Sequence, residues 1–325
     1  RARAVRAFSA RDHTLNRRTA LRPEVWLFLK GAMMGAADIV PGVSGGTIAF
    51  ITGIYERLIA ALRGFLPAFI ELVKARDWKM FWQQADMTFL MVLLMGIISS
   101  VAALAKLISW LLVAYPIPLW SAFFGLIVAS VFIVQASIRQ RHVVLMLPFL
   151  MGAAIAFSLT LLSPVSLSPS LLNAFMSGVL AICAMILPGI SGSFILVMLG
   201  SYGFILEAIT SMNLSVLSIF ALGCLVGLLS IAQLLGWAFE HFHDATLAFL
   251  TGVMVGALNK VWPWREVLSW RSNQQGDLVP EVERSVGPTY YEQVVGVDAQ
   301  YGLAILCMVL AFTMVIAAER LARRI

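Results

Sequence analysis

The chain has 325 residues, of which 60% are hydrophobic and only 12% are charged, whereas a soluble domain usually has about 25% charged residues. This composition excludes an ordinary soluble enzyme or binding domain and indicates a protein that lies in lipid. The net charge of +6 does not indicate a nucleic-acid partner. Seven arginines precede Glu24 and three follow Glu319, beside apolar segments, where retention in the cytoplasm explains them.

In chain order, we expect a basic cytoplasmic tail over 1–24, a first membrane repeat over 25–162 and a second over 163–325. A membrane-spanning helix needs roughly 20 apolar residues. On this basis, spans are predicted over 88–114, 118–138, 143–162, 214–238, 245–260 and 300–318, and the charged segment 261–299 is predicted to be an extracytoplasmic loop. The tail is followed by no small-residue cleavage pattern, so no removable signal peptide is expected.

Two further apolar stretches, 25–62 and 170–209, are each interrupted near the middle by a proline-glycine pair, Pro41-Gly42 and Pro188-Gly189. Proline lacks the N–H and glycine relaxes the backbone, so neither helix can continue through its break. We predict two broken hairpins that are re-entrant, because their turns lack the charge expected at a membrane face. The alternative is two complete spans joined by a tight turn, which leaves the flanking topology unchanged.

The two stretches also match each other when the first is shifted by 147 residues, with ten identities in 25 positions across both breaks. Beyond them a shift of 127 residues pairs Gly96, Trp110 and Gly125 with Gly223, Trp237 and Gly252. Each repeat therefore comprises one broken hairpin and three spans. Because a re-entrant hairpin returns to its own side and three spans cross, the second repeat is predicted to be inverted.

Charge placement is an independent test of this topology. With the N-terminus inside, the inner loops hold Arg63, Lys74, Arg139 and their neighbouring basic residues, while the long outer loop is acidic. All loops but the short segment 240–244 follow the positive-inside rule. The prediction is an all-α polytopic membrane protein of two inverted repeats, with both termini in the cytoplasm.

Inverted repeats with broken helices place a substrate site near the midplane, where half-helix N-termini attract an anion. Ser44 and Ser191 are suitable N-caps, and the residues after them expose amides and hydroxyls toward the breaks. A phosphate suits this arrangement. The alternative is that small residues only let the helices pack closely. The candidate substrate-binding residues here are Ser44, Gly45, Gly46, Thr47, Ser191, Gly192 and Ser193.

Ionisable residues inside apolar segments are further candidates, because a charge at a helix centre is costly to insert. Arg57 is expected either to hold a head group on entry or to extend to the interface, and Lys106 either faces the cavity as a counter-charge or extends to the outer surface. Asp38 and Glu56 are candidates for binding a coupling proton or cation.

Other chemistry is not expected. Cys183, Cys224 and Cys307 each fall inside an apolar segment without metal-ligand spacing, so we predict no disulfide framework, metal or cofactor. The histidines fall in the tail or in predicted loops, so an intramembrane lipid phosphatase finds no histidine to pair with Ser44 or Ser191.

The segment Gly35-Ala-Ala-Asp-Ile-Val-Pro-Gly-Val-Ser-Gly-Gly-Thr-Ile-Ala-Phe50, continued by Gly53-Ile-Tyr-Glu-Arg-Leu-Ile59, resembles the signature of the bacterial polyprenyl-phosphate transporter family. The second copy, from Leu187 to Ser193, and the segments Gly256–Leu258 and Lys260–Trp264 resemble it too. The resemblance implies a translocase of the inner membrane that returns undecaprenyl phosphate from the outer to the cytoplasmic leaflet. Gly203 departs from the pattern, since a glutamate is expected after Tyr202 as in Tyr55-Glu56, and this leaves Glu56 as the better coupling candidate.

The main rival function is transport of a small soluble anion by the same hairpins. A lipid substrate predicts a site open sideways to the bilayer, and a soluble one predicts a closed aqueous vestibule. The sequence does not decide the exact lipid, the coupling ion or the oligomeric state, for which a homo-oligomer is one option.

Overall fold

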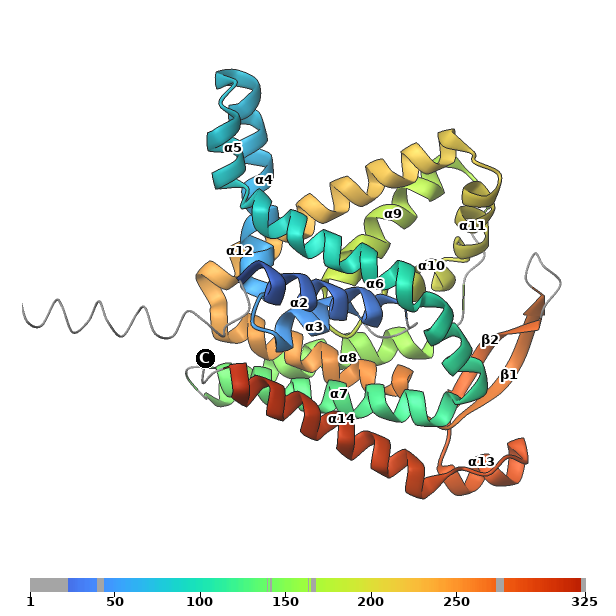
Figure 1. The fold of residues 1–325 in the computed structure, drawn as a ribbon. Helices are drawn as coiled ribbons and strands as arrows, with labels where there is room; N and C mark the ends of the chain where they lie inside the picture. The colour runs from blue at the N-terminus through green and yellow to red at the C-terminus, as the bar shows by residue number, and fades with distance from the viewer. Residues whose placement is uncertain are drawn as a thin grey trace, which may run out of the picture.

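A computed structural model describes residues 23–39, 44–138, 140, 142–162, 164, 168–272 and 278–322. Most of the predicted tail, together with Pro41, Gly42 and Arg139, lies outside these residues. The chain folds into long helices that run side by side, with a two-stranded sheet at one end (Figure 1). The helices are α2 (Pro23–Asp38), α3 (Gly45–Ile51), α4 (Tyr55–Ala75), α5 (Trp78–Gln84), α6 (Met87–Ala114), α7 (Pro116–Ser137), α8 (Met146–Leu161), α9 (Leu171–Ile186), α10 (Gly192–Met198), α11 (Tyr202–Thr210), α12 (Leu214–Ala257), α13 (Pro288–Val295) and α14 (Tyr301–Ala322), with 3-10 turns η1 (Val143–Leu145) and η2 (Leu258–Val261) and strands β1 (Arg265–Ser272) and β2 (Leu278–Ser285).

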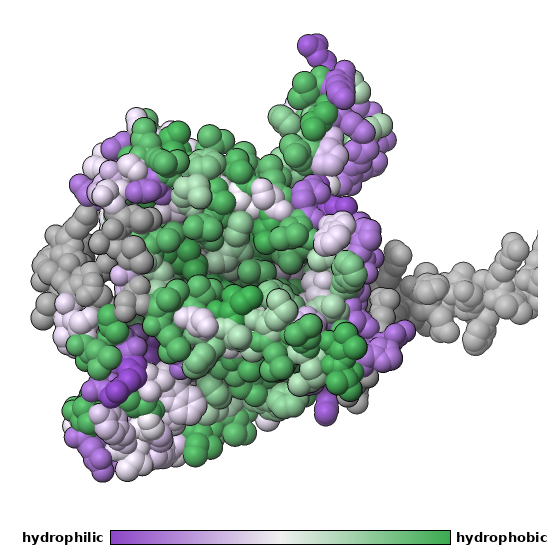
Figure 2. Space-filling model, turned by 180° about the vertical axis from the view of Figure 1, so that it is seen from behind, coloured by the Kyte–Doolittle hydropathy of each residue, from purple (hydrophilic) through white to green (hydrophobic). Residues whose placement is uncertain are grey.

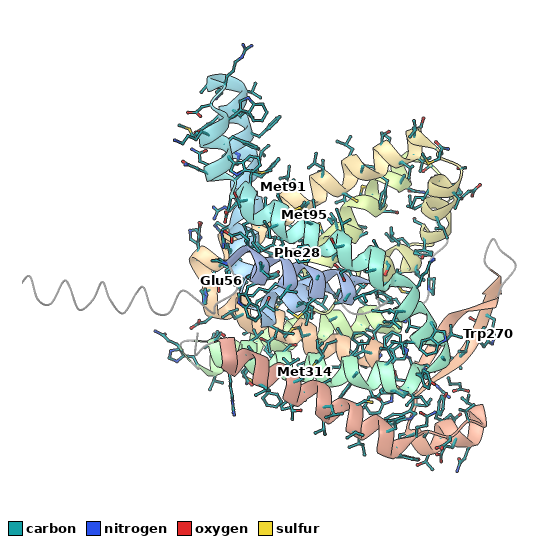
Figure 3. All side chains as sticks on the ribbon, in the orientation of Figure 1. Phe28, Glu56, Met91, Met95, Trp270 and Met314 are labelled. Carbon is teal, nitrogen blue, oxygen red and sulfur yellow. The ribbon has the colours of Figure 1, made fainter. Side chains whose placement is uncertain are left out.

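The prediction of an all-α polytopic membrane protein is confirmed. Within the described residues, four helical stretches are long and apolar enough to cross a membrane, and a fifth is added if the bent pair α10–α11 counts as one span. The four are Met87–Ala114, Pro116–Ser137, Val143–Leu161 and Leu214–Val261. Large apolar side chains such as Met91 and Met95 on α6 and Met314 on α14 are exposed on the outside of the bundle (Figure 3), as expected where lipid is the solvent.

The two halves present the same elements in the same order. Helices α2, α3 and α4 correspond to α9, α10 and α11, and α6 and α7 correspond to the two parts of α12. The clearest mark is a pair of non-helical residues. Tyr115, between α6 and α7, has φ −137° and ψ 56°, and Phe242, at the kink inside α12, has φ −138° and ψ 48°. The sequence analysis predicted separate spans over 214–238 and 245–260, and the structure has two helical parts there that meet at a kink at Phe242 in place of a longer loop.

Glycines allow the same helix contacts in both halves. Gly31 on α2 lies against the backbone of Leu93 on α6, and its counterpart Gly178 on α9 lies against Phe220 on α12. The third helices are exchanged between the halves. Gly125 on α7 lies against Met308 on α14, whereas Gly252 on α12 lies against Phe149 on α8. Each half therefore completes its packing with the last helix of the other, which interlocks them.

Each predicted hairpin contains a second break that the sequence analysis did not identify. The first separates α3 from α4 at Gly53 (φ +69°), and the second separates α10 from α11 at Gly200 (φ +63°), where α10 and α11 meet at 109°. Only glycine adopts these left-handed angles at little cost. The short helices α3 and α10 are therefore isolated by breaks on both sides.

Helices α4 and α5 form a hairpin that projects from the bundle, across the direction of the long helices (Figure 1). Phe81 on α5 packs against Phe65 and Phe69 on α4. Figure 2 shows apolar side chains along one side of this projection and polar side chains along the other. The first predicted hairpin therefore extends past residue 62 into an amphipathic arm.

The described residues of the predicted outer loop 261–299 include two paired strands that the sequence analysis missed. Strands β1 and β2 pair antiparallel, with an irregularity around Ser269. The indole N–H of Trp262 donates to the Val286 carbonyl at 2.8 Å, and that of Trp264 donates to the Ala299 carbonyl at 2.9 Å. These bonds tie the β-hairpin and the segment after it to the end of η2.

Candidate functional site

The tips of the two hairpins meet, although they are more than a hundred residues apart in the chain. The hydroxyl of Ser44 donates to the Met185 carbonyl at 2.8 Å, and the hydroxyl of Tyr55 donates to the Ile186 carbonyl at 3.2 Å. These carbonyls belong to the last turn of α9, where no helical partner is available. Side chains of the first hairpin thus satisfy the end of α9.

A third bond joins the tips at the second break. The backbone N–H of Gly189 donates to the Thr47 hydroxyl at 3.0 Å. Gly189 has φ +93° and follows buried Pro188, and a side chain there would also approach Met254. The Pro188-Gly189 pair therefore sets a turn that only glycine accommodates, while Pro41 and Gly42 lie outside the described residues.

The two predicted caps behave differently. Ser44 is fully buried and its hydroxyl accepts the N–H of Gly46 at 3.1 Å, which is a side-chain cap of α3. Ser191 makes no such cap on α10. Its hydroxyl instead lies 2.8 Å from that of Ser193. The halves are alike in backbone and unlike in polar contacts.

The Asp38 carboxylate reaches back to the start of α3, where it accepts the N–H of Gly45 at 2.6 Å. Together with Ser44, it occupies the two amides that the sequence analysis offered to a phosphate. Gly45 and Gly46 are buried, so the tip of the first hairpin is closed in this structure. Asp38 is thus positioned to act on the tip itself.

The other predicted charges lie away from the tips. Arg57 donates twice to Asp86, at 2.7 and 3.1 Å, and stacks over Phe89. Glu56 accepts from His243 at 3.1 Å (Glu56 is labelled in Figure 3). Lys106 is exposed on α6. Within the described part of the chain, Arg57, Glu56 and Lys106 therefore make no hydrogen bond or ion pair with the meeting point of the hairpins.

Histidines 241 and 243 were expected in a loop, yet they lie at the kink of α12. His243 contacts both Glu56 and Asp244. No group of three or more potential metal ligands occurs among the residues that the structure describes. The kink therefore links the base of α4 to α12 through charged side chains.

A side chain of the long helix that begins each hairpin forms a hydrogen bond at the second break of that hairpin. The Lys30 ammonium on α2 donates to the Thr52 carbonyl at 2.7 Å. In the other half the Ser177 hydroxyl on α9 donates to Ser201 at 2.8 Å, and Ser201 donates to the Leu199 carbonyl at 3.4 Å. The sequence contained a signal for this pairing, because Lys30 and Ser177 align in the repeat, but neither was singled out.

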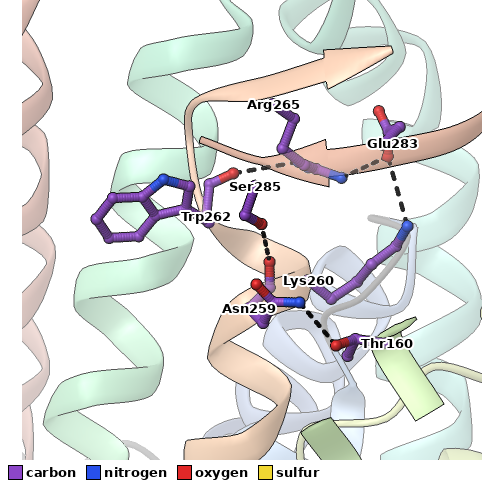
Figure 4. Close-up of polar contacts among 7 residues, drawn as sticks. All are labelled: Thr160, Asn259, Lys260, Trp262, Arg265, Glu283 and Ser285. Carbon is purple, nitrogen blue, oxygen red and sulfur yellow. Dashed lines mark hydrogen bonds and ion pairs between the residues drawn. The ribbon is translucent and has the colours of Figure 1, made fainter. Parts of the chain in front are cut away.

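A partly buried ionic cluster beside the second hairpin was also missed (Figure 4). Glu283 on β2 accepts from Arg265 at 2.8 Å and lies 3.4 Å from the Lys260 ammonium on η2. Arg265 also donates to the Trp262 carbonyl and stacks over Trp120. Burial lowers the pKa of Arg265. Burial favours the neutral acid of Glu283, but the charges of Arg265 and Lys260 outweigh it and hold the pKa of that carboxyl below its usual value.

Asn259 and Thr160 continue the polar contacts of this cluster. The Asn259 amide donates to the Thr160 hydroxyl at 2.7 Å, and Ser285 on β2 donates to the Asn259 carbonyl at 3.0 Å (Figure 4). Because Thr160 lies at the end of α8, these bonds join α8, η2 and the β-hairpin at one place next to the Pro188-Gly189 break.

Residues 34–279 match the family described as VCA0040-like, undecaprenyl phosphate translocase-like. The chain belongs to this family. A protein of Vibrio cholerae serotype O1 named polyprenyl-phosphate transporter is 46% identical over 297 residues, which cover 91% of this chain and 96% of that protein. A Staphylococcus aureus protein of the same name is 33% identical over 260 residues, 73% of this chain and 86% of its own length. No solved structure matches.

Membership in the VCA0040-like family confirms the resemblance drawn from the two proline-glycine motifs. The matched region begins within α2 and contains both proline-glycine breaks, the second hairpin and Lys260, and it ends within β2 before Glu283. Since both relatives are named as transporters, the prediction of a membrane transporter is confirmed over that of an enzyme.

Proposed function

We propose that the chain is a translocase that carries undecaprenyl phosphate from the outer to the cytoplasmic leaflet of the bacterial inner membrane. Its role would be to recycle the carrier lipid for peptidoglycan and other envelope glycans. Support comes from the family match over 34–279 and from two relatives named for polyprenyl-phosphate transport.

The observation that carries the proposal is the contact between the hairpin tips. Among the described residues, three hydrogen bonds, from Ser44, Tyr55 and Gly189, join polar groups that a long apolar bundle otherwise surrounds. Opening this contact would release hydroxyls and amides at one level of the bundle. A phosphate could pass there while its polyprenyl tail remains in the bilayer, so the protein needs to shield only the head group.

In this proposal the phosphate path includes Ser44, Gly45, Gly46 and Thr47 from the first hairpin and Ser191, Gly192 and Ser193 from the second. The two repeats are inverted, both termini are cytoplasmic and both hairpins are re-entrant. The matching backbone at Tyr115 and Phe242 supports a repeat with two equivalent arrangements, which alternating access requires.

The sequence analysis favoured Glu56 for coupling to a proton or cation gradient, but the contacts in the structure favour Asp38. Its carboxylate holds the Gly45 amide at 2.6 Å, so a proton on it would weaken the bond that closes α3. Glu56 is exposed and faces His243, where it would sense the cytoplasmic side. Binding of a proton by Asp38 would thus favour opening of the first tip.

The alternative is a transporter of a small soluble anion, and an intramembrane lipid phosphatase is less favoured because no histidine contacts Ser44 or Ser191 among the described residues. An assay in proteoliposomes separates these functions. Undecaprenyl phosphate would be distributed in both leaflets, and a membrane-impermeant phosphatase would report the pool exposed outside. A translocase should drain the inner pool through the outer leaflet. No increase over empty liposomes, or release of phosphate without added phosphatase, would refute the proposal.

A further inference from the structure

A small cavity lies between the second hairpin and η2. Its wall includes Gly189 and Ser191 from the break, Phe194 from α10, Thr160 from α8 and Lys260 from η2. Its volume is about 10 Å³, which suffices for about one water molecule. The Lys260 ammonium lies 5.1 Å from the centre of the Phe194 ring. A cation and a hydroxyl thus share one closed space beside the proline-glycine break.

The charges around this cavity do not balance. Lys260 and Arg265 supply two positive charges, and Glu283 supplies one negative charge to both. Arg265 has the shorter bond, at 2.8 Å, and the more buried side chain, while Lys260 lies at 3.4 Å. The neighbouring pair Arg284 and Glu266 neutralises itself at 2.7 Å. Counted over the described side chains, the cluster therefore carries a net positive charge, which is costly in a mostly buried place unless an anion compensates it.

Hydroxyl donors are also found here, because Ser191 is part of the cavity wall and Ser193, outside the wall, lies within hydrogen-bond distance of Ser191. Ser191 and Ser193 share one hydrogen bond between their hydroxyls, which uses one of their two protons. The remaining proton is available to an acceptor. An ammonium near a hydroxyl pair matches a phosphate monoester, which presents several strong acceptor oxygens and negative charge.

We propose that this cavity is the outer phosphate subsite of the transport path, with Lys260 as its counter-charge and Ser191 and Ser193 as its hydroxyl donors. This inference rests on the proposed function. When no phosphate is bound, Glu283 pairs with Lys260 in its place. When lipid phosphate arrives, Lys260 exchanges Glu283 for the phosphate, and Arg265 retains Glu283. Because the cavity is far too small for a phosphate, α10 must separate from η2 during this exchange.

Other cations fit this role less well. Arg57 already has a bidentate carboxylate in Asp86, and its side chain is 58% exposed. Lys106 is exposed on α6 and makes no described contact with either hairpin tip. A larger hollow of about 350 Å³ lies on the other side of η2, between Phe124, Asn259 and Trp262, but no charged side chain is among its lining residues. Among the described cations, Lys260 combines burial, a hairpin contact and an exchangeable carboxylate.

The test measures binding of farnesyl phosphate, a short polyprenyl phosphate, to the purified full chain in nanodiscs. Farnesol and inorganic phosphate serve as separate probes. The variants are Lys260→Gln and Lys260→Arg, and Arg284→Gln is the matched control that removes a neighbouring exposed cation. We expect Lys260→Gln to weaken farnesyl phosphate binding by about 10-fold to 100-fold, as for loss of a charged hydrogen bond. Lys260→Arg should retain most of the affinity, and Arg284→Gln should not change it.

A double-mutant cycle separates binding from support of the β-hairpin. If Lys260 acts only by holding Glu283, then Lys260→Gln should have no further effect in a Glu283→Gln background. If Lys260 binds phosphate, the loss persists there, and Glu283→Gln alone tightens binding because the competing carboxylate is gone. Glu283→Gln leaves Arg265 without its carboxylate partner, so unfolding temperatures are measured for each variant. If Glu283→Gln does not fold, the Lys260 single variants decide whether Lys260 binds phosphate.

The outcomes distinguish the subsite from the function. Wild-type affinity in Lys260→Gln, or a loss that vanishes in the Glu283→Gln background, overturns the subsite and leaves the transport proposal intact. Failure of the unmodified protein to bind farnesyl phosphate or to move undecaprenyl phosphate overturns the proposed function. Equally tight, Lys260-dependent binding of inorganic phosphate would overturn a lipid as the ligand of this cavity.

Discussion

The contact between the hairpin tips predicts that the two equivalent serines have unequal effects on stability. Ser44→Ala removes a hydroxyl that makes two hydrogen bonds, to the Gly46 amide at 3.1 Å and to the Met185 carbonyl at 2.8 Å. Ser191→Ala removes a hydroxyl that bonds only to Ser193. Both serines are buried, so burial does not explain a difference between them.

The magnitude follows from these bonds. An N-cap serine contributes about 0.5–2 kcal/mol, and a side-chain hydrogen bond inside a membrane protein contributes about 0.6 kcal/mol on average. Ser44→Ala should therefore lower the free energy of unfolding by about 1–3 kcal/mol, because the Gly46 amide and the Met185 carbonyl are left without partners. Ser191→Ala should cost less than about 1 kcal/mol, since Ser193 can rotate its hydroxyl to another acceptor.

Reversible unfolding in mixed micelles with increasing dodecyl sulfate would measure both changes. Tyr55→Phe, which removes the neighbouring bond to Ile186, should fall between them. Equal destabilisation by Ser44→Ala and Ser191→Ala would refute the asymmetry. So would a change below about 0.5 kcal/mol for Ser44→Ala, since that is the lower limit for a cap.

Four further predictions follow from other contacts. A side chain at Gly45 would meet the Asp38 carboxylate, and one at Gly192 would meet the Ala181 carbonyl, whereas Gly203 has open space. Gly45→Ala and Gly192→Ala should therefore reduce transport in proteoliposomes with equal protein insertion. Gly203→Ala should not. Asp38→Asn should abolish the dependence of transport on a pH or sodium gradient, and Glu56→Gln should do so less; wild-type dependence in both variants would place coupling elsewhere. Arg265 and Lys260 lower the pKa of Glu283, so its ionised form stabilises the fold above its unfolded pKa of about 4.3, and this contribution is lost as pH falls through the lower folded pKa. The unfolding temperature should therefore drop on acidification below about pH 4. Glu283→Gln should remove the part of that drop that comes from Glu283. The α4–α5 arm is expected to lie along the membrane surface. In a background without native cysteines, a spin label at exposed Val73 should then be accessible to oxygen, and a spin label at Lys74 should be accessible to a water-soluble relaxation agent. Identical accessibility at both positions would contradict an interfacial arm.

The sequence was sufficient for the polytopic class and for the family, because composition, hydropathy and the proline-glycine motifs are local. It also indicated that Ser44 and Ser191 are equivalent, since they align in the repeat. It predicted both as N-caps, which is confirmed for Ser44, but it did not indicate that Ser44 also bonds to Met185 or that Ser191 makes no side-chain cap. That difference depends on where the C-terminal turn of α9 lies, which no local pattern encodes.

Other features were visible only in part. Gly53 and Gly200 align in the repeat, and both have positive φ in the structure. Their alignment is visible in the sequence, but an aligned glycine does not by itself predict a second break. The alternation of apolar and polar residues in β1 and β2 is typical of strands, but the acidic composition of the segment favours a loop. The exchange of α8 and α14 had no signal, because Gly125 and Gly252 gain their meaning only from helices distant in the chain.

The interlocked halves and the unequal tips together constrain how the protein could open. Because α8 packs on the second half and α14 on the first, neither half can swing away as a unit without disturbing the other. Short helices α3 and α10, with a break on each side, are the elements free to move within that frame. The bonds between the tips that the described residues make each use a side chain of the first hairpin, from Ser44, Thr47 or Tyr55. The second hairpin keeps a hydroxyl pair near Lys260. In the proposed mechanism, release of the first tip and loading of the second are therefore separate events, and a substrate at Lys260 would bind before the tips part.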